Sequence, residues 1–326
     1  MSALQWPLLA LAGLAVIAGA GLAAAIAFGT AAAPEAMASV SAPMSKVDYS
    51  DMPRPQHFQA RDGTTLSYRL YPHDGDRVAV LIHGSSGESS GMHAVARALA
   101  AVGFAVYVPD LRGHADDGRL GDIDYAGQLD DDLVDLMQVV RHDHPQAGVA
   151  LVGHSSGGGF VLRIAEGRHT GLFARYVLLA PALHYGAPTW RPGAGGWATP
   201  FIPRIIGQSI LDRLGIHWFQ HLPAVAFAVT PNVPVRLAPA YSYVMLQNFA
   251  APNDDLARFG QVHAPVALLA GAQDEIFYSD RFAPLLGPLR PAATLQVVPG
   301  VDHMGLITQP EALAAIVATL QATPGS

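Results

Sequence analysis

The sequence predicts an α/β fold in which a mostly parallel sheet is flanked by helices. The first observation is that, from Gln56 onward, short apolar runs suited to buried strands alternate with stretches of helical spacing. This alternation is typical of βαβ units and therefore of a parallel sheet. The second observation is a turn rich in glycine and serine at residues 153–157, between one such run and a helical stretch. The third is a long segment without charge at the N-terminus, apart from the alternating region.

The N-terminal segment, residues 1–33, is expected to be a membrane anchor. It is apolar and uncharged from Trp6 to Phe28, and as a helix this span would be about 33 Å long, enough to cross a bilayer. A cleaved signal sequence that exports the protein is the second interpretation, because small residues lie at 31–33. A buried core helix is the third. The first basic residue is Lys46, so charge does not indicate the side of the membrane.

The alternating region is expected to form a core in two parts, residues 56–183 and 262–326. Residues 34–55, rich in Ala, Ser and Pro and without an apolar period, are expected to be a linker before it. The core opens with a hairpin that turns at Asp62-Gly63. The other expected strands are 78–82, 104–110, 148–153, 175–181, 265–271 and 293–300, and the expected helices are 92–103, 125–145, 157–167 and 310–322.

An insertion over residues 184–261 interrupts the alternation of strands and helices. It is rich in Pro, Trp, Phe and Tyr. An unstructured segment of this length would be unusual inside a compact domain. We therefore expect a small helical cap over the sheet.

The composition excludes several classes of protein. Apolar residues make up 51% of the chain and charged residues 14%, so the chain is not disordered. The net charge of −7, with no long basic run, argues against a nucleic-acid partner. The absence of cysteine rules out disulfides and thiolate metal sites. Asp130–Asp132 lack the pattern of a calcium loop and are expected on a solvated helix face.

The stretch Gly153-His154-Ser155-Ser156-Gly157 has the G-x-S-x-G pattern of a nucleophile elbow. It lies after a predicted strand and before a predicted helix, which is the context that this motif requires. The strained turn needs neighbours without bulk, and the following helix N-terminus favours developing negative charge. Ser155 is therefore the candidate nucleophile, rather than part of an ordinary loop.

A nucleophilic serine needs a base, and the base needs an acid that orients it. With this elbow they should follow in the order serine, acid, histidine. Asp274 follows one predicted strand and His303 follows the next, and the carboxyl ends of parallel strands are where such sites form. Asp302 is a rival acid, but a residue adjacent to His303 should point elsewhere, and Glu275 is a weaker rival.

Two backbone N–H groups are expected to form the oxyanion hole. One belongs to Ser156, the residue after the nucleophile. The other is expected from Ser85, in the loop His83-Gly84-Ser85-Ser86-Gly87 after the strand at 78–82. His83 and His154 are explained by these two motifs without a metal. We expect no metal site and no cofactor.

These motifs resemble those of the α/β-hydrolase superfamily. The segment from His83 to His114 resembles the oxyanion loop, strand and R-G-H turn of its monoacylglycerol lipase and lysophospholipase group, which includes serine aminopeptidase-like members. "GHSSGG", "GAQDEIF" and "GVDHMG" resemble that group's elbow, acid and base segments. Ser156 replaces the methionine or similar residue usual after the nucleophile, and the R-G-H-G turn reads "RGHADDG". The insertion at 184–261 does not match closely.

The sequence thus predicts a membrane-tethered serine hydrolase that cleaves carboxylic esters through an acyl-enzyme. Its partners should be a small ester and, through the N-terminal segment, a membrane. The apolar insertion favours lipid-like or medium-chain acyl groups, with Phe201 and Trp218 as candidate substrate-binding residues. The alternatives are a small-residue aminopeptidase, a cofactor-free haloperoxidase-like enzyme and a non-catalytic membrane-bound binding scaffold.

Overall fold

The central sheet has eight strands, in the order β1-β2-β4-β3-β5-β6-β10-β11. Strand β2 pairs antiparallel with β1 and β4, and the other pairings are parallel. The carboxyl ends of the parallel strands therefore meet at one edge, as the alternation predicts. The strands are β1 (Gln56–Gln59), β2 (Thr65–Tyr71), β3 (Arg77–Ile82), β4 (Ala105–Pro109), β5 (Gly148–His154), β6 (Arg175–Leu179), β10 (Val266–Gly271) and β11 (Ala293–Val298).

The computed structural model describes residues 5–114, 118–230, 235–251, 262, 264–286 and 293–322. The other residues, which include 252–261 of the insertion, lie outside the described part of the chain.

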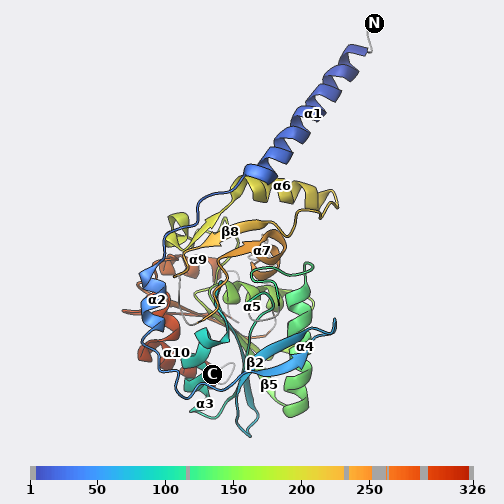
Figure 1. Ribbon diagram of the computed structural model, residues 1–326. Helices are drawn as coiled ribbons and strands as arrows, with labels where there is room; N and C mark the ends of the chain where they lie inside the picture. The colour runs from blue at the N-terminus through green and yellow to red at the C-terminus, as the bar shows by residue number, and fades with distance from the viewer. Residues whose placement is uncertain are drawn as a thin grey trace.

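Helices α3 (His93–Ala100) and α10 (Pro310–Gln321) pack together on one side of the sheet, and α4 (Gln128–Asp143) lies on the other (Figure 1). Helix α5 (Ser156–Glu166) starts at the predicted elbow, and the short α9 (Phe282–Leu286) precedes β11.

The insertion contains helices, as the sequence predicts, and in addition a small sheet that it does not predict. It contains α6 (Ile202–Arg213) and α7 (Tyr243–Phe249), but also a three-stranded antiparallel sheet of β7 (Ala198–Pro200), β8 (Pro223–Phe227) and β9 (Ala240–Ser242). These strands are too short for a period of two to be visible in the sequence. Prolines at their ends also disguise them, because proline is tolerated at strand ends and edges.

The N-terminal region forms two helices. Helix α1 (Gln5–Phe28) extends away from the body, and its C-terminal end lies on α6 (Figure 1). Leu9–Phe28 is long and apolar enough to cross a membrane, with a mean hydropathy of 2.3. The sequence predicts only a linker over residues 34–55, whereas the structure places α2 (Ala38–Met44) there, packed against the core.

The acidic start of α4 is paired rather than solvated, so the expectation for Asp130–Asp132 is wrong. Asp130 forms an ion pair with Arg163, and Asp131 forms one with Arg61. Asp132 is buried and accepts two hydrogen bonds of 2.8 Å from the guanidinium of Arg112. The last pair joins α4 to the R-G-H turn at residues 112–114.

Candidate active site

Ser155 lies on a strained turn between β5 and α5. Its φ of 55° and ψ of −119° are unusual for a residue with a side chain. Glycines surround it because the backbone is crowded: a Cβ on Gly153 would lie 2.2 Å from the carbonyl oxygen of Gly157. A Cβ on Gly157 would lie 2.4 Å from the carbonyl oxygen of His83. The glycine- and serine-rich turn thus allows a sharp change of direction that places Ser155 at the edge of the sheet.

Asp274 and His303 follow β10 and β11, as the sequence predicts, and the structure brings them together. The ring Nδ1 of His303 lies 2.8 Å from the Asp274 Oδ2 atom, and both side chains are buried. The other carboxylate oxygen of Asp274 accepts hydrogen bonds of 2.8 Å from the N–H groups of Ile276 and Phe277. Since a carboxylate only accepts, Nδ1 of His303 carries a proton, and in the neutral ring Nε2 is the nitrogen without one.

These contacts control the ionisation of Asp274. Burial alone would raise the pKa of Asp274, but the charge interaction and hydrogen bond with His303 oppose it. The N–H groups of Phe277 and Ile276 oppose it further, so the pKa of Asp274 lies below its ordinary value. The carboxylate is therefore ionised at neutral pH and able to hold the imidazole in one tautomer.

The two rival acids have other partners. The Asp302 Oδ1 atom accepts a hydrogen bond of 2.6 Å from the N–H of Gly305. The Glu275 Oε2 atom accepts one of 3.0 Å from the backbone N–H of His303, not from its ring. Both carboxylates therefore support the loop that carries His303, while Asp274 contacts the ring itself.

Ser155 and His303 both line one cavity of about 690 Å³. This volume is within the roughly 300–1,000 Å³ typical of small-ligand sites. Ser85, Ser86 and His154 line the same cavity. The cavity therefore brings together the candidate nucleophile, the candidate base and the loop predicted to bind the oxyanion.

The N–H groups of Ser85 and Ser156 are available as donors. Among the described residues, neither donates to a backbone or side-chain acceptor. His83 supports the loop: its Nδ1 lies 2.9 Å from the carbonyl oxygen of Gly84, and its Nε2 lies 3.2 Å from the N–H of Leu111. This pattern requires a neutral ring with the proton on Nδ1, in accord with burial, which lowers the pKa of His83. His83 is thus a structural residue.

A buried hydrogen-bonded chain joins the predicted oxyanion loop, residues 83–87, to the cap and to the R-G-H turn. The N–H of Ser86 donates to the hydroxyl of Tyr241 over 2.6 Å, and this hydroxyl lies 2.5 Å from Nε2 of His114. Nδ1 of His114 lies 3.1 Å from the carbonyl oxygen of Arg112. Burial, together with the neighbouring His83, holds the pKa of His114 well below its ordinary value. The neutral ring therefore donates at Nδ1 and accepts from Tyr241.

Phe201 and Trp218, the candidate substrate-binding residues, are not among the residues that line this cavity. Phe201 is buried beside α6, with the Arg204 guanidinium 5.8 Å from its ring centre. Trp218 is 82% exposed. Their apolar character predicts a role in burial or binding, but it does not indicate which face of the cap they occupy. The cap instead contributes Trp197, whose Nε1 donates to the Ser85 Oγ atom over 2.9 Å.

Residues 34–55, for which the sequence predicts only a linker, also contribute side chains to the cavity. Met37, Val40, Met44 and Met52 line the cavity together with residues from the core. The available signal was the spacing of Met37, Val40 and Met44, since residues three and seven positions apart share one face of a helix. Further lining residues are Met92, Met304, Ile276, Ile307, Ala228, Val229, Val235 and Leu237.

The comparisons with known proteins agree with this architecture. The family described as serine aminopeptidase, S33 matches residues 73–309. A monoacylglycerol lipase of Mycolicibacterium smegmatis is 32% identical over 138 residues, which are 40% of this chain. That match spans only about half, 48%, of the relative's length.

Two solved structures share the fold at lower sequence identity. A soluble variant of monoglyceride lipase from Saccharomyces cerevisiae, in complex with a substrate analogue, has a TM-score of 0.65. It is 16% identical, and the match covers 85% of this chain and 96% of that one. The esterase Pf2001 of Pyrococcus furiosus has a TM-score of 0.55 at 16% identity and covers 83% and 93%. The chain has the α/β-hydrolase fold and belongs to the serine aminopeptidase S33 family.

Proposed function

We propose that this protein is a serine hydrolase that cleaves carboxylic esters, with Ser155, His303 and Asp274 as its catalytic triad. The observation that carries the proposal is the 2.8 Å contact between His303 and Asp274, beside a cavity that the strained Ser155 also lines. Similarity to a monoacylglycerol lipase supports the choice of ester substrates. The apolar residues around the cavity support an acyl chain as the group bound there.

The proposed reaction has two steps. Nε2 of His303 takes the proton of the Ser155 hydroxyl as its oxygen attacks the ester carbonyl, while Asp274 stabilises the imidazolium. The N–H groups of Ser85 and Ser156 bind the oxyanion of the tetrahedral intermediate. Collapse breaks the bond to the alcohol, which leaves with the proton from His303. Water then attacks the acyl-enzyme in the same way, and the acid is released.

We infer that helix α1 anchors the enzyme in a membrane. Its 24 residues correspond to about 36 Å, against the roughly 30 Å of a bilayer's hydrocarbon core. Only 6% of the most apolar stretch of this helix is buried in the protein, which disfavours a core helix. The buried Arg204 donates to the carbonyl oxygens of Ile26 and Ala27, at 2.8 and 3.1 Å. Cleavage after residues 31–33 would remove these partners, which favours an anchor that is retained.

The outer surface of α6 supports the same inference. A stripe of large apolar side chains is exposed there, next to the end of α1: Ile202, Ile206, Ile210 and Leu214. These positions recur every four residues and so share one face of the helix. Exposed apolar patches of this kind mark interaction sites, and the adjacent α1 makes lipid the fitting partner.

The ester substrate class is tested by the chain-length dependence of kcat/KM on p-nitrophenyl esters. A buried methylene contributes roughly 0.8 kcal/mol, or about fourfold in affinity. We expect kcat/KM to rise over several methylenes from the acetyl ester and then to level off when the cavity is full. The Ser155→Ala protein should be inactive on every ester. A preference for acetyl esters would contradict the lipid-like assignment, and a preference for aminoacyl amides with a free amine would favour the aminopeptidase.

A further inference from the structure

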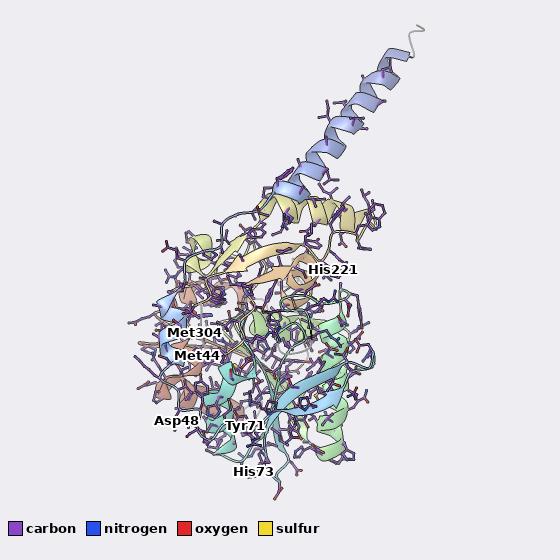
Figure 2. All side chains as sticks on the ribbon, in the orientation of Figure 1. Met44, Asp48, Tyr71, His73, His221 and Met304 are labelled. Carbon is purple, nitrogen blue, oxygen red and sulfur yellow. The ribbon has the colours of Figure 1, made fainter. Side chains whose placement is uncertain are left out.

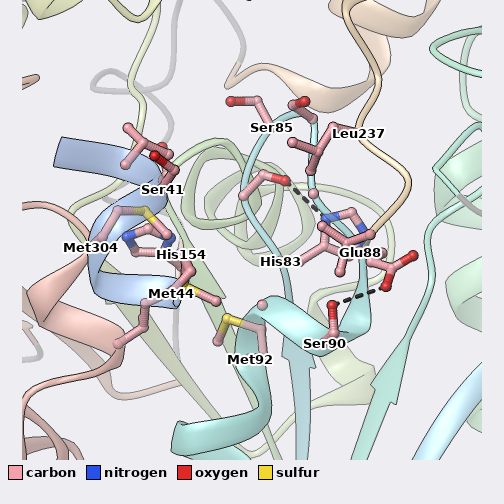
Figure 3. A pocket seen from close by; sticks show the side chains of 18 of the residues that line it. Ser41, Met44, His83, Ser85, Glu88, Ser90, Met92, His154, Leu237 and Met304 are labelled. Carbon is pink, nitrogen blue, oxygen red and sulfur yellow. Dashed lines mark hydrogen bonds between the residues drawn. The ribbon is translucent and has the colours of Figure 1, made fainter. Parts of the chain in front are cut away.

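The segment that joins the membrane helix to the core also forms part of the cavity wall. Residues on one face of α2 and on the chain after it line the cavity: Met37, Val40, Ser41, Met44, Ser45, Tyr49 and Met52. The first five recur at the spacing of a single helical face. Figure 3 shows Ser41 and Met44 on the same side of the cavity as His154 and Met304.

Hydrogen bonds hold this segment at both ends. The N–H of Met37 donates to the carbonyl oxygen of Ala228, at the end of β8, over 3.2 Å. Nε2 of His93, on α3, lies 3.0 Å from the carbonyl oxygen of Asp48. Arg69, on β2, donates to the carbonyl oxygen of Pro53 over 2.6 Å. The segment is therefore attached to the cap, to helix α3 and to the sheet, and it belongs to the folded domain.

Methionine is concentrated around this cavity. Of the chain's eight methionines, five line it within the described residues, namely Met37, Met44, Met52, Met92 and Met304. Met44 and Met304 come from opposite ends of the sequence and lie close together in the molecule (Figure 2). The methionine side chain is unbranched, flexible and polarisable, so it adapts to irregular apolar partners. No charged residue lies between Met37 and Ser45.

We propose that the cavity-lining side chains of residues 37–52 form the acyl-binding wall of the site and set the length of unbranched acyl chain that it accepts. This inference rests on the proposed ester hydrolysis. This wall belongs to the connection between helix α1 and the core. The apolar composition of the insertion had instead predicted that the cap binds the acyl group. A flexible alkyl chain is the ligand that suits several adaptable methionines, while Ser155 and the N–H groups of Ser85 and Ser156 take the ester group.

The test compares two variants of α2 in the full-length protein, purified in detergent. Met44→Trp puts bulk into the cavity, and Ala42→Trp puts the same bulk on the exposed face of the same helix. The measurement is kcat/KM on p-nitrophenyl esters from acetyl to palmitoyl. We expect Met44→Trp to lower the ratio of long-chain to acetyl kcat/KM by about fourfold for each methylene excluded. Ala42→Trp should keep the wild-type ratio, and equal profiles for both variants would overturn the proposal.

A binding measurement separates this inference from the proposed chemistry. Lauric acid binding is measured for Ser155→Ala alone and combined with Met44→Trp or with Ala42→Trp. We expect Met44→Trp to weaken binding at least tenfold and Ala42→Trp to leave it unchanged, whether or not the wild-type enzyme hydrolyses esters. Equal affinities would reject the acyl wall, whereas wild-type protein that hydrolyses no ester but shows the difference in binding would reject only the proposed reaction.

Discussion

The role proposed for Asp274 depends both on its position in the sequence and on the groups that surround its carboxylate. Its place after a parallel strand is visible in the sequence, and so is that of His303. The two N–H donors to its second oxygen, from Ile276 and Phe277, are not visible there, because they depend on the turn after β10. The glycines around Ser155 were predictable for a simple reason: a crowded turn tolerates no side chains.

We predict that Asp274→Asn lowers kcat by roughly 10³–10⁴-fold, as the corresponding error in imidazole tautomer does in serine proteases. Asp302→Asn is the matched control, because this neighbouring carboxylate contacts the N–H of Gly305 rather than the imidazole. Steady-state kinetics on a short p-nitrophenyl ester measure both variants. If Asp302→Asn proved the more damaging change, the acid of the triad would be misassigned.

His154 makes the stability of the protein depend on pH. Burial, aided by the nearby His303, lowers the pKa of His154 to about 3, whereas an unfolded histidine has a pKa of about 6.5. Between these values the unfolded chain binds the additional proton, so stability falls as the pH is lowered from about 6.5. At pH 5 the loss from this group is about 2 kcal/mol.

The measurement is the thermal unfolding of wild-type protein and His154→Gln at pH 7.5 and pH 5.0. We expect the drop in unfolding temperature between the two conditions to be several degrees smaller in the variant, because glutamine does not titrate. His83 and His114, whose pKa values are also lowered by burial, contribute equally to both proteins. An identical drop in the two proteins would show that His154 is not held neutral by the fold.

At the scale of the elements, the strand and helix alternation predicted the main sheet almost to the residue. Buried parallel strands are continuous apolar runs, which are easily recognised. The cap sheet and α2 were missed because β7, β9 and α2 are short, with three, three and seven residues. Elements of this size are specified mainly by the partners they pack against, and a single sequence does not identify these partners.

Tyr241, on β9, connects the cap to the predicted oxyanion loop through its hydrogen bond with the N–H of Ser86. We predict that Tyr241→Phe lowers kcat about tenfold with little change in KM, because the N–H of Ser86 and Nε2 of His114 lose their shared partner. A buried polar group without a partner costs roughly 1–3 kcal/mol. The backbone at Ser86 would therefore shift toward another partner and would move the adjacent Ser85. Kinetics on the acetyl ester measure the effect.

Tyr243→Phe is the control for this prediction. Tyr243 is also buried in the cap, two residues further along the chain, and no partner for its hydroxyl lies among the described residues. Its removal should leave kcat close to the wild-type value. A KM effect without a kcat effect in Tyr241→Phe would mean that the cap acts on substrate binding and not on the oxyanion loop.

At the scale of the whole molecule, α1 and the exposed stripe of α6 define one apolar end (Figure 1). A helix long and apolar enough to cross a membrane was predictable from length and composition alone. Its packing against α6 was not, because it depends on Gly207, where an added Cβ would lie 2.8 Å from the Ile26 side chain. Gly29, just after α1, is crowded in the same way, since an added Cβ would lie 2.7 Å from the backbone nitrogen of Arg204 on α6. Close approach of the two helices therefore rests on glycines that the sequence does not distinguish from others.

We predict that the full-length protein stays in the membrane fraction after washes with high salt and with alkaline carbonate. The double variant Leu14→Arg/Ile17→Arg should move to the soluble fraction, because each charge at the centre of a membrane helix costs roughly 2.5–3.5 kcal/mol. Leu14→Ile/Ile17→Leu is the matched control and should remain in the membrane. Soluble wild-type protein with residues 1–33 intact would contradict an anchor.

Covalent labelling tests most directly whether Ser155 is an activated nucleophile in an assembled site. Folded full-length protein is treated with a fluorophosphonate probe, and the labelled residue is located by mass spectrometry. The triad predicts a single adduct on Ser155, absent from Ser155→Ala and slowed in Asp274→Asn. Folded protein that takes no label, or label on another residue in both wild type and Ser155→Ala, would contradict the serine-hydrolase assignment and favour a non-catalytic binding scaffold.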